Sequence, residues 1–463
     1  MLRLQGEQVE SLWDGILPAE ARALPDDLAA IDELLRDPKL FGPIEAHWRR
    51  EAEERGRSAM GYGRPTIPMA TYLRLMVLKQ RTGWGYETLV KEVSDSLHLR
   101  RFCLIGIDQS PPDESTIRKL TRRLGPETVA GLTRALIAKA TRETRFRCRA
   151  VRIDSTVVEA DIRYPTDAGL ARQGARMLAR EGRRVQALLG ASKTKVRDRS
   201  RALGRRLRAI TRTARRRTGE AKAEVLALTG ETGRLLAASA REARTLAEEA
   251  RRRARGRGAR RKLMAARCLD ELTTRCEQVA RQIEKRLAGE PIAERIVSLS
   301  DPDARPIRKG KLGKPTEFGY VEQLAEVTPS TRPRVRGFIL PPATAPGNPG
   351  ENELLPATVR ELEALGLAPT EVALDGGFQT KPSEETLAPL SPKRIYIAGR
   401  TRPGSRRTLR RLARYRTGAE GRVSHLKRGY GLRRSRLKGE AGQRIWTGWA
   451  ALAYNLDTYG LYA

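Results

Sequence analysis

The chain has 463 residues, of which 90 are Lys or Arg and 55 are Asp or Glu, so its formal charge is +35 and its pI is near 10.9. A basic surplus of this size indicates a polyanionic partner, and because arginine binds phosphate through paired hydrogen bonds, nucleic acid is the first candidate. Four cysteines without close spacing, and no apolar run near the roughly 18 residues that span a bilayer, argue against a disulfide framework, a zinc site and a membrane protein, and favour a reducing cytoplasm.

The N-terminal region is predicted to be helical. Short segments punctuated by prolines come first, followed by a tighter pattern. In this pattern Tyr72, Leu73, Met76 and Val77 mark an amphipathic helix that ends at Gly83. Nothing in this part of the sequence indicates catalytic chemistry.

A further helix is expected over residues 113–124, after the break at Ser110-Pro111-Pro112. Its basic and hydroxyl side chains fit the recognition helix of a helix-turn-helix-like unit, which would contact DNA. The alternative is an ordinary surface helix of a basic protein. The candidate DNA contacts on this helix are Ser115, Thr116, Arg118, Lys119, Arg122 and Arg123.

The segment 150–160 alternates as a strand but carries Asp154 in its middle. A lone acid in a buried strand is costly unless it binds something, so Asp154 is a candidate site residue. Three other acids follow it: Glu159, Asp161 and Asp167. Strand alternation puts Glu159 on the opposite face, and we prefer Asp154 to all three.

A strongly basic helical segment comes next. Residues 171–290 contain 34 Lys or Arg against 13 Asp or Glu, which accounts for most of the net charge. Apolar residues at heptad-like spacing predict long helices in an antiparallel hairpin or small bundle, with reversals near Thr218-Gly219 and Gly256-Arg257-Gly258. Such an arm could clamp DNA or pair two protomers; the alternative is a solvated helix pair without a partner. Its expected phosphate contacts are Arg215, Arg216, Arg217, Arg251, Arg252 and Arg253.

Several short strands are predicted after this insertion, together with a helix at 352–365. A run of strands followed by alternating helices and strands is typical of a mixed sheet covered by helices. Asp375 ends one of these strands and is followed by two glycines and Phe378, a pattern found both in active sites and in plain turns. The predicted strands are 295–299, 318–324, 335–340, 371–375 and 393–398.

A helix over this segment would carry Arg416, Glu420 and Lys427 on one face. At about 100° per residue, the side chains four and eleven residues after Arg416 point within roughly 40° of its direction. Gly418 and Gly421 bracket Glu420, which suits the close approach of a ligand to the backbone. Taken alone, the segment also fits a charged surface helix.

If Asp154, Asp375 and Glu420 come together, they cannot all stay ionised without a cation. Oxygen ligands favour Mg²⁺, with Mn²⁺ able to substitute. Two such ions about 4 Å apart would activate the attacking hydroxyl and stabilise the leaving oxygen of a phosphoryl transfer. Arg416 and Lys427 would then hold DNA phosphates, with Arg422 beside them.

The final helix has core spacing. We expect its two tryptophans, Trp446 and Trp449, to pack against the sheet and not to stack on bases.

Together these motifs resemble the DDE transposases of bacterial insertion sequences. The strand around Asp154 with Tyr-Pro-Thr-Asp at 164–167 matches, and Asp375-Gly376-Gly377-Phe378 fits the family's Asp-x-Gly-Phe/Tyr. The spacing of Arg, Glu and Lys at 416–427 fits its Tyr-Arg-Glu-Lys signature, although Ala413 stands at the tyrosine position. The helical segment 64–124 is similar to the family's N-terminal domain.

The resemblance implies an α/β protein with a ribonuclease-H-like mixed sheet flanked by helices, an all-α N-terminal domain and a long helical insertion after the first strand. The expected domains are a DNA-binding domain (1–145), a catalytic domain (146–168 and 291–463) and a basic coiled-coil-like insertion (169–290).

The resemblance also implies an enzyme with Asp154, Asp375 and Glu420 as catalytic residues and ligands of two Mg²⁺ ions. It would bind inverted repeats at transposon ends, cleave there and transfer the 3′-hydroxyls to target DNA, as a homodimer on DNA at the bacterial nucleoid. A catalytically inactive DNA-binding derivative and a related metal-dependent nuclease are the alternatives.

Overall fold

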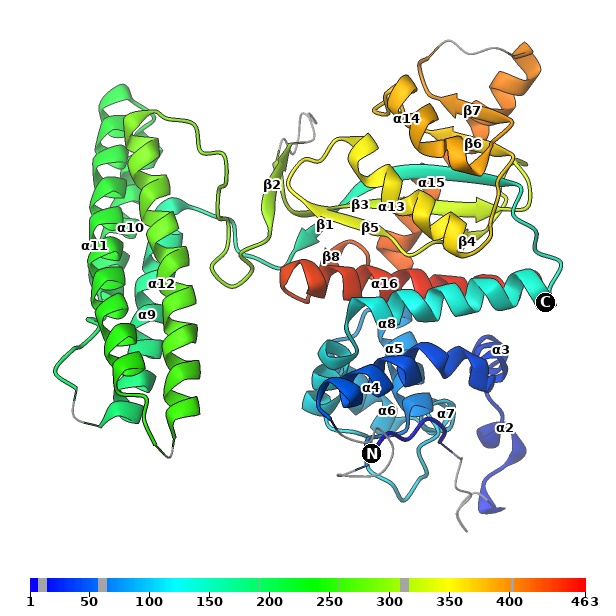
Figure 1. The fold of residues 1–463 in the computed structure, drawn as a ribbon, viewed down its shortest axis with the longest axis horizontal. Coiled ribbons are helices and arrows are strands. Elements are labelled where there is room, and N and C mark those ends of the chain that lie inside the picture. Colours follow the sequence, from blue (N-terminus) through cyan, green and yellow to red (C-terminus); the bar gives the residue numbers. More distant parts are fainter. Residues whose placement is uncertain (7–14, 57–64, 191, 257, 309–315, 401–403) are drawn as a thin grey trace. The chain divides into compact units, whose positions relative to one another are not determined.

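A computed structural model of the protein describes residues 1–6, 15–56, 65–190, 192–256, 258–308, 316–400 and 404–463. The chain divides into two compact units, both drawn in Figure 1. The first unit comprises Met1–Asp161 and Gly319–Ala463, and the second comprises Ile162–Phe318. The second unit is therefore an insertion into the sequence of the first.

The N-terminal part of the first unit is helical, as predicted. The helix α5 ends at Gly83, which adopts a left-handed backbone conformation (φ 72°). The N–H of Gly83 donates to the Lys79 carbonyl. The elements are α2 (Ala19–Arg22), α3 (Asp26–Leu34), η1 (Pro38–Phe41), α4 (Gly42–Glu54), α5 (Met69–Thr82), α6 (Tyr86–Asp95), α7 (Leu97–Phe102) and α8 (Glu114–Glu143, kinked at Gly125).

The prediction that α5 is amphipathic was wrong, because almost all of its residues are buried. The polar side of the helix is enclosed by specific partners. Arg74 forms a buried ion pair with Asp32 at 2.7 Å, and the ammonium of Lys79 lies 4.3 Å from the centroid of the Trp446 ring. Polar groups satisfied in this way can occupy a core position.

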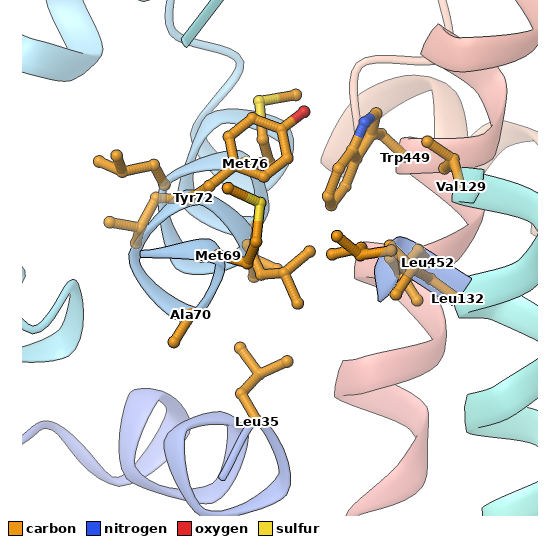
Figure 2. Packing of buried hydrophobic residues seen from close by; sticks show 14 of the residues in the cluster. Leu35, Met69, Ala70, Tyr72, Met76, Val129, Leu132, Trp449 and Leu452 are labelled. Atoms are coloured by element: carbon orange, nitrogen blue, oxygen red, sulfur yellow. The ribbon is translucent and has the colours of Figure 1, made fainter. Parts of the chain in front are cut away.

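The C-terminal helix α16 (Gly439–Tyr459) packs on the N-terminal helices with one face. Trp449 is buried and meets Tyr72 of α5 edge to face at 5.8 Å, with Leu132 and Leu452 beside them (Figure 2). Both tryptophans were expected to pack against the sheet, but Trp446 and Trp449 both belong to the helical core. The opposite face of α16 presents alanines and Tyr454 to the sheet core.

The sheet of the first unit is mixed. Its central strands run in the order β3-β1-β6-β7; β3 is antiparallel to β1, whereas β6 is parallel to β1 and β7 is parallel to β6. The strands β4 and β5 pair with β3, and β8 pairs with β1. The bounds are β1 (Ala150–Ala160), β3 (Thr316–Thr328), β4 (Phe338–Ile339), β5 (Ala343–Pro346), β6 (Glu371–Leu374), β7 (Arg394–Ile397) and β8 (Arg434–Ser435).

Helices flank this sheet: α13 (Glu351–Ala364), α14 (Thr380–Leu387, followed by η3, Ala388–Leu390), α15 (Arg406–Gly429) and α16. The predicted ribonuclease-H-like α/β fold with a helical N-terminal region is thus confirmed. The strand predicted at 335–340 is reduced to the two residues of β4. None of the described helices is long and apolar enough to cross a bilayer.

The described residues of the second unit form a helical bundle, to which the short strand β2 (Arg305–Arg308) is added. Its helices are α9 (Asp167–Leu189), α10 (Ser200–Thr213, followed by η2, Ala214–Arg216), α11 (Gly219–Arg252) and α12 (Ala259–Ala288). Leu178, Val185 and Leu269 of the predicted apolar seams lie in its core. The reversals fall where predicted, although Arg257 lies outside the described residues.

The strand predicted at 295–299 was wrong. This segment has no regular secondary structure and belongs to the helical unit, where Ile296 and Leu299 pack into the core of the bundle. The Gln282 side chain binds both the N–H and the carbonyl of Ile296, at 2.6 and 3.3 Å. These side-chain bonds take the place of a strand ladder.

Candidate active site

Asp154 lies on β1, next to the point where β6 ends. The last paired residues of the two parallel strands are Ile153 and Leu374, so the next residues, Asp154 and Asp375, are neighbours at one edge. Burial, together with the charges of Asp375 and Glu351, raises the pKa of Asp154 to about 6, against the opposing effect of Arg416. The two acids thus share one electrostatic environment.

The loop after Asp375 is tightly built. The Phe378 ring is fully buried and its N–H donates to the Asp375 carbonyl at 3.2 Å, which anchors the turn. A Cβ at Gly376 would lie 3.2 Å from the Ala398 carbonyl oxygen, and one at Gly377 would lie 3.0 Å from Cγ of Glu351. The two glycines are therefore explained by close approach and not by flexibility.

The helix α15 brings Arg416 and Glu420 to this edge of the sheet. Arg416 forms ion pairs with Asp375 and, at 2.9 Å, with Glu420. The Arg416 side chain is mostly buried, whereas 60% of the Glu420 side chain is exposed. A cation therefore bridges two of the three predicted acids, which offsets their mutual repulsion.

A buried ion pair holds α15 against the sheet. Arg152, two residues before Asp154, pairs with Glu326 of β3 at 2.6 Å and donates to the Tyr415 carbonyl at 3.1 Å. A Cβ at Gly418 would overlap the Arg152 guanidinium. Gly418 was expected to admit a ligand, but the structure shows that it admits Arg152.

Among the predicted DNA contacts on α15, Arg422 points inward and pairs with Glu326 at 3.0 Å. Lys427 donates to the Val157 carbonyl of β1 at 2.9 Å. Tyr415, two positions from the family's tyrosine, is buried and its hydroxyl hydrogen-bonds to Thr328 at 2.7 Å. Its ring belongs to the packing of α15.

The competing acids lie in other environments. Asp167, in the second unit, is almost fully buried and pairs with Arg286 and Arg295 at 2.7 and 2.6 Å. In the first unit, Glu159 pairs with Arg434 at 2.9 Å, and the Asp161 side chain is 60% exposed.

The basic residues proposed at 113–124 all lie on α8. Arg118 pairs with Glu114, and Arg123 pairs with Glu51 while its guanidinium lies 3.6 Å from the Trp48 ring centroid. The remaining candidates are partly buried or exposed: Ser115, Thr116, Lys119 and Arg122.

The arginine runs of the second unit are exposed at the ends of its helices. Arg216 pairs with Glu224, Arg251 with Asp270 at 2.6 Å, and Arg253 with Glu249 at 2.9 Å. The other members of the two runs are Arg215, Arg217 and Arg252.

Glu351 was not among the residues predicted from the sequence. This residue opens α13, is mostly buried and accepts a hydrogen bond from the Ser155 hydroxyl, beside Asp154. Its only sequence signal is an acid in the first turn of a helix, which is common at any helix start.

The donor set suits a hard cation, since it consists of carboxylate oxygens. As they stand, no three His, Cys, Asp or Glu side chains within the described part of the chain are close enough to hold one ion. Arg416 occupies the space between Asp375 and Glu420, so the side chains would have to turn toward an ion to bind it.

Two parts of the chain match known families of transposase domains. Residues 23–123 match a family described as Transposase domain (DUF772), and residues 330–456 match one described as Transposase DDE domain. The two matches together support an insertion-sequence DDE transposase, a family that generally depends on divalent metals. No curated protein and no solved structure matches it.

Proposed function

We propose that this transposase binds the inverted repeats of its element, cleaves DNA at their ends and joins the 3′-hydroxyls to target DNA. The observation that supports this most is the meeting of Asp154 and Asp375 at one edge of the sheet, with Arg416 and Glu420 of α15 beside them. Acids from two parallel strands and a following helix can hold cations against a phosphodiester.

Asp154, Asp375 and Glu420 are the proposed catalytic residues and would hold two Mg²⁺ ions. Bound Mg²⁺ would lower the pKa of an attacking water or hydroxyl and stabilise the leaving oxygen. Arg416, which already bridges two of the acids, would be freed by the ions to hold a DNA phosphate. Lys427 is the second proposed phosphate contact on this helix.

Other parts of the chain would extend the DNA contact. On α8, the exposed Lys119 and Arg122 are the proposed contacts, and in the second unit the runs 215–217 and 251–253 are proposed to bind phosphates. We propose that residues 1–145 form the DNA-binding domain, and we move the expected limits of the catalytic domain (146–168 and 291–463) and the basic insertion (169–290) to those of the two compact units, so that the insertion is Ile162–Phe318. The protein is proposed to act as a dimer on paired ends, in the bacterial cytoplasm.

The test is a cleavage assay on DNA that carries the inverted repeats flanking the gene. The wild-type protein should nick this DNA at the repeat ends with Mg²⁺ or Mn²⁺ and not with EDTA. Asp154→Asn, Asp375→Asn and Glu420→Gln should lose cleavage while a gel-shift assay shows unchanged DNA binding. Full cleavage by any one of these variants would reject that residue.

A catalytically inactive derivative would bind the repeats and cleave nothing under any metal condition. A general nuclease would instead cleave DNA without repeats equally well. Both outcomes would reject the proposed function while leaving the family membership intact.

A further inference from the structure

A fourth carboxylate, that of Glu351, lies near enough to the two aspartates of the candidate site for their charges to act on one another. Its side chain accepts a hydrogen bond from Ser155, the residue after Asp154. Its stem covers Gly377, two residues after Asp375, where a Cβ would come within 3.0 Å of Cγ. Glu351 therefore contacts both the residue after Asp154 on β1 and the loop that follows Asp375.

The start of α13 is fixed in place by polar contacts. The backbone carbonyl of Glu351 accepts from the Gln323 side chain of β3 at 2.9 Å. The next residue, Asn352, accepts from the Gln379 N–H at 2.8 Å and donates to Ser383 at 2.8 Å. These bonds tie the helix start to both the sheet and the loop that follows Asp375, so the Glu351 position is well defined.

Among the residues that the structure describes, the Glu351 carboxylate has no cationic partner. No described Lys or Arg lies within ion-pair distance of it, whereas Asp375 and Glu420 share Arg416. Burial and the charge of Asp375 raise the pKa of Glu351, while the Ser155 hydrogen bond acts in the opposite direction. A mostly buried acid that is unpaired and lies beside two others is costly unless a cation joins them.

We propose that Glu351 is a fourth acidic residue of the site and gives an oxygen, directly or through a bound water, to the divalent cation that Asp154 and Asp375 hold. The inference rests on the proposed function. The proposed ligand on α13 is additional to Asp154 on β1, Asp375 after β6 and Glu420 on α15.

Glu353 provides a matched control. It lies in the same helical turn, is exposed, and accepts a hydrogen bond from the Gly350 N–H, which a glutamine can also do. Glu351→Gln and Glu353→Gln thus make the same chemical change on one helix. The first changes a mostly buried residue near the aspartates, and the second changes an exposed residue. Asp154→Asn serves as the reference for loss of the site.

The experiment measures Mn²⁺ binding to the full chain without DNA, from the electron paramagnetic resonance signal of free Mn²⁺. Glu351→Gln should raise the Kd for Mn²⁺ by about tenfold, a loss typical of residues that support a metal site. Glu353→Gln should stay within about twofold of the wild type. Without metal, Glu351→Gln should melt at or above the wild-type temperature, because a like charge has been removed.

A purely structural role would lower the melting temperature of Glu351→Gln and leave Mn²⁺ affinity unchanged, which would overturn the inference. If Glu351→Gln does not fold, Glu351→Ala takes its place, and wild-type Mn²⁺ affinity in that variant would overturn the inference. If Asp154→Asn loses Mn²⁺ and Glu351→Gln does not, only this inference fails. If Asp154→Asn also binds like the wild type, the proposed function fails with it.

Discussion

Each unit contains a buried or partly buried aspartate, and the charges around the two aspartates differ in sign. In the helical unit, Asp167 is almost fully buried and is clamped by Arg286 and Arg295. In the sheet unit, Asp154 is partly buried beside Asp375 and Glu351, and its pKa is raised to about 6. One acid is neutralised by fixed partners, whereas the other is kept among like charges. The comparison indicates that Asp167 stabilises the fold, whereas Asp154 is placed to bind a cation.

The largest expected effect is on catalysis by Asp154→Asn. The cleavage rate should fall roughly a thousandfold, corresponding to the several kcal/mol that a metal ion contributes to the transition state. The melting temperature should be unchanged or higher, because burial of the charge and its repulsion by Asp375 are both relieved. Rates from a fluorescent cleavage assay and a calorimetric melt test the two parts.

Asp161→Asn, at the exposed end of the same strand, is the control and should change neither quantity. A large loss of stability in Asp154→Asn would mean that the acid is structural, and the contrast with Asp167 would disappear.

Asp167→Asn should show the reverse pattern. Removing this carboxylate leaves two arginines without their buried partner, so the free energy of unfolding should fall by about 3 kcal/mol. Urea unfolding followed by circular dichroism measures this change. Glu271→Gln, which breaks only an exposed pair with Arg267, should cost less than about 0.5 kcal/mol. Equal stability of the two variants would contradict the structural role of Asp167.

Glu322 of β3 is a third buried acid, and its hydrogen-bond partners are uncharged side chains. It is fully buried, accepts hydrogen bonds from Gln443 at 2.8 Å and Thr344 at 2.7 Å, and burial raises its pKa to about 8. The folded state therefore holds this proton to a higher pH than the unfolded state does. Its contribution to stability is complete below the unfolded pKa of about 4.3 and is lost as the pH rises through 8.

Between pH 6 and pH 8 the loss should be about 2 kcal/mol in the wild type, while Glu322→Gln removes this slope. Denaturant unfolding at several pH values measures the effect. The same pH dependence in both proteins would show that Glu322 does not carry it.

The smallest expected effect concerns the exposed arginines. Replacing Arg215 and Arg217 with glutamine should weaken DNA binding and reduce the slope of log affinity against log salt by about 1 for each lost phosphate contact. Arg267→Gln, at another exposed position of the helical unit, is the control. Fluorescence anisotropy at several salt concentrations measures the slope for each protein. Equal slopes for the wild type, the Arg215 and Arg217 variant and Arg267→Gln would show that Arg215 and Arg217 do not contact the DNA.

Most of the architecture could be predicted from periodicity and from strand-ending acids. The segments that became β1, β6, β7 and α15 were all predicted, since each has a regular pattern and a clear end. The exceptions were decided by tertiary contacts. The segment 295–299 has strand composition, but Gln282 takes its backbone bonds. Gly418 has the appearance of a ligand contact, but its missing side chain makes room for Arg152.

The same reasoning explains which residues near the site could be foreseen. Asp154 and Asp375 are unusual for their strands and therefore stand out in the sequence. Glu351 does not, because an acid at a helix start is favoured by the helix dipole whether or not it binds anything. Its relation to the aspartates exists only once β1, β6 and α13 are folded together.

The most direct measurement is strand transfer with pre-cut ends. DNA ending in the inverted repeat with a free 3′-hydroxyl is incubated with a plasmid target and Mg²⁺, and the joined products are sequenced. The wild-type protein should join that 3′ end to the target, and Asp375→Asn should form none of this product although it binds the DNA equally well. Joining at the wild-type level by Asp375→Asn, or no joining by a wild-type protein that binds both DNAs, would contradict the account.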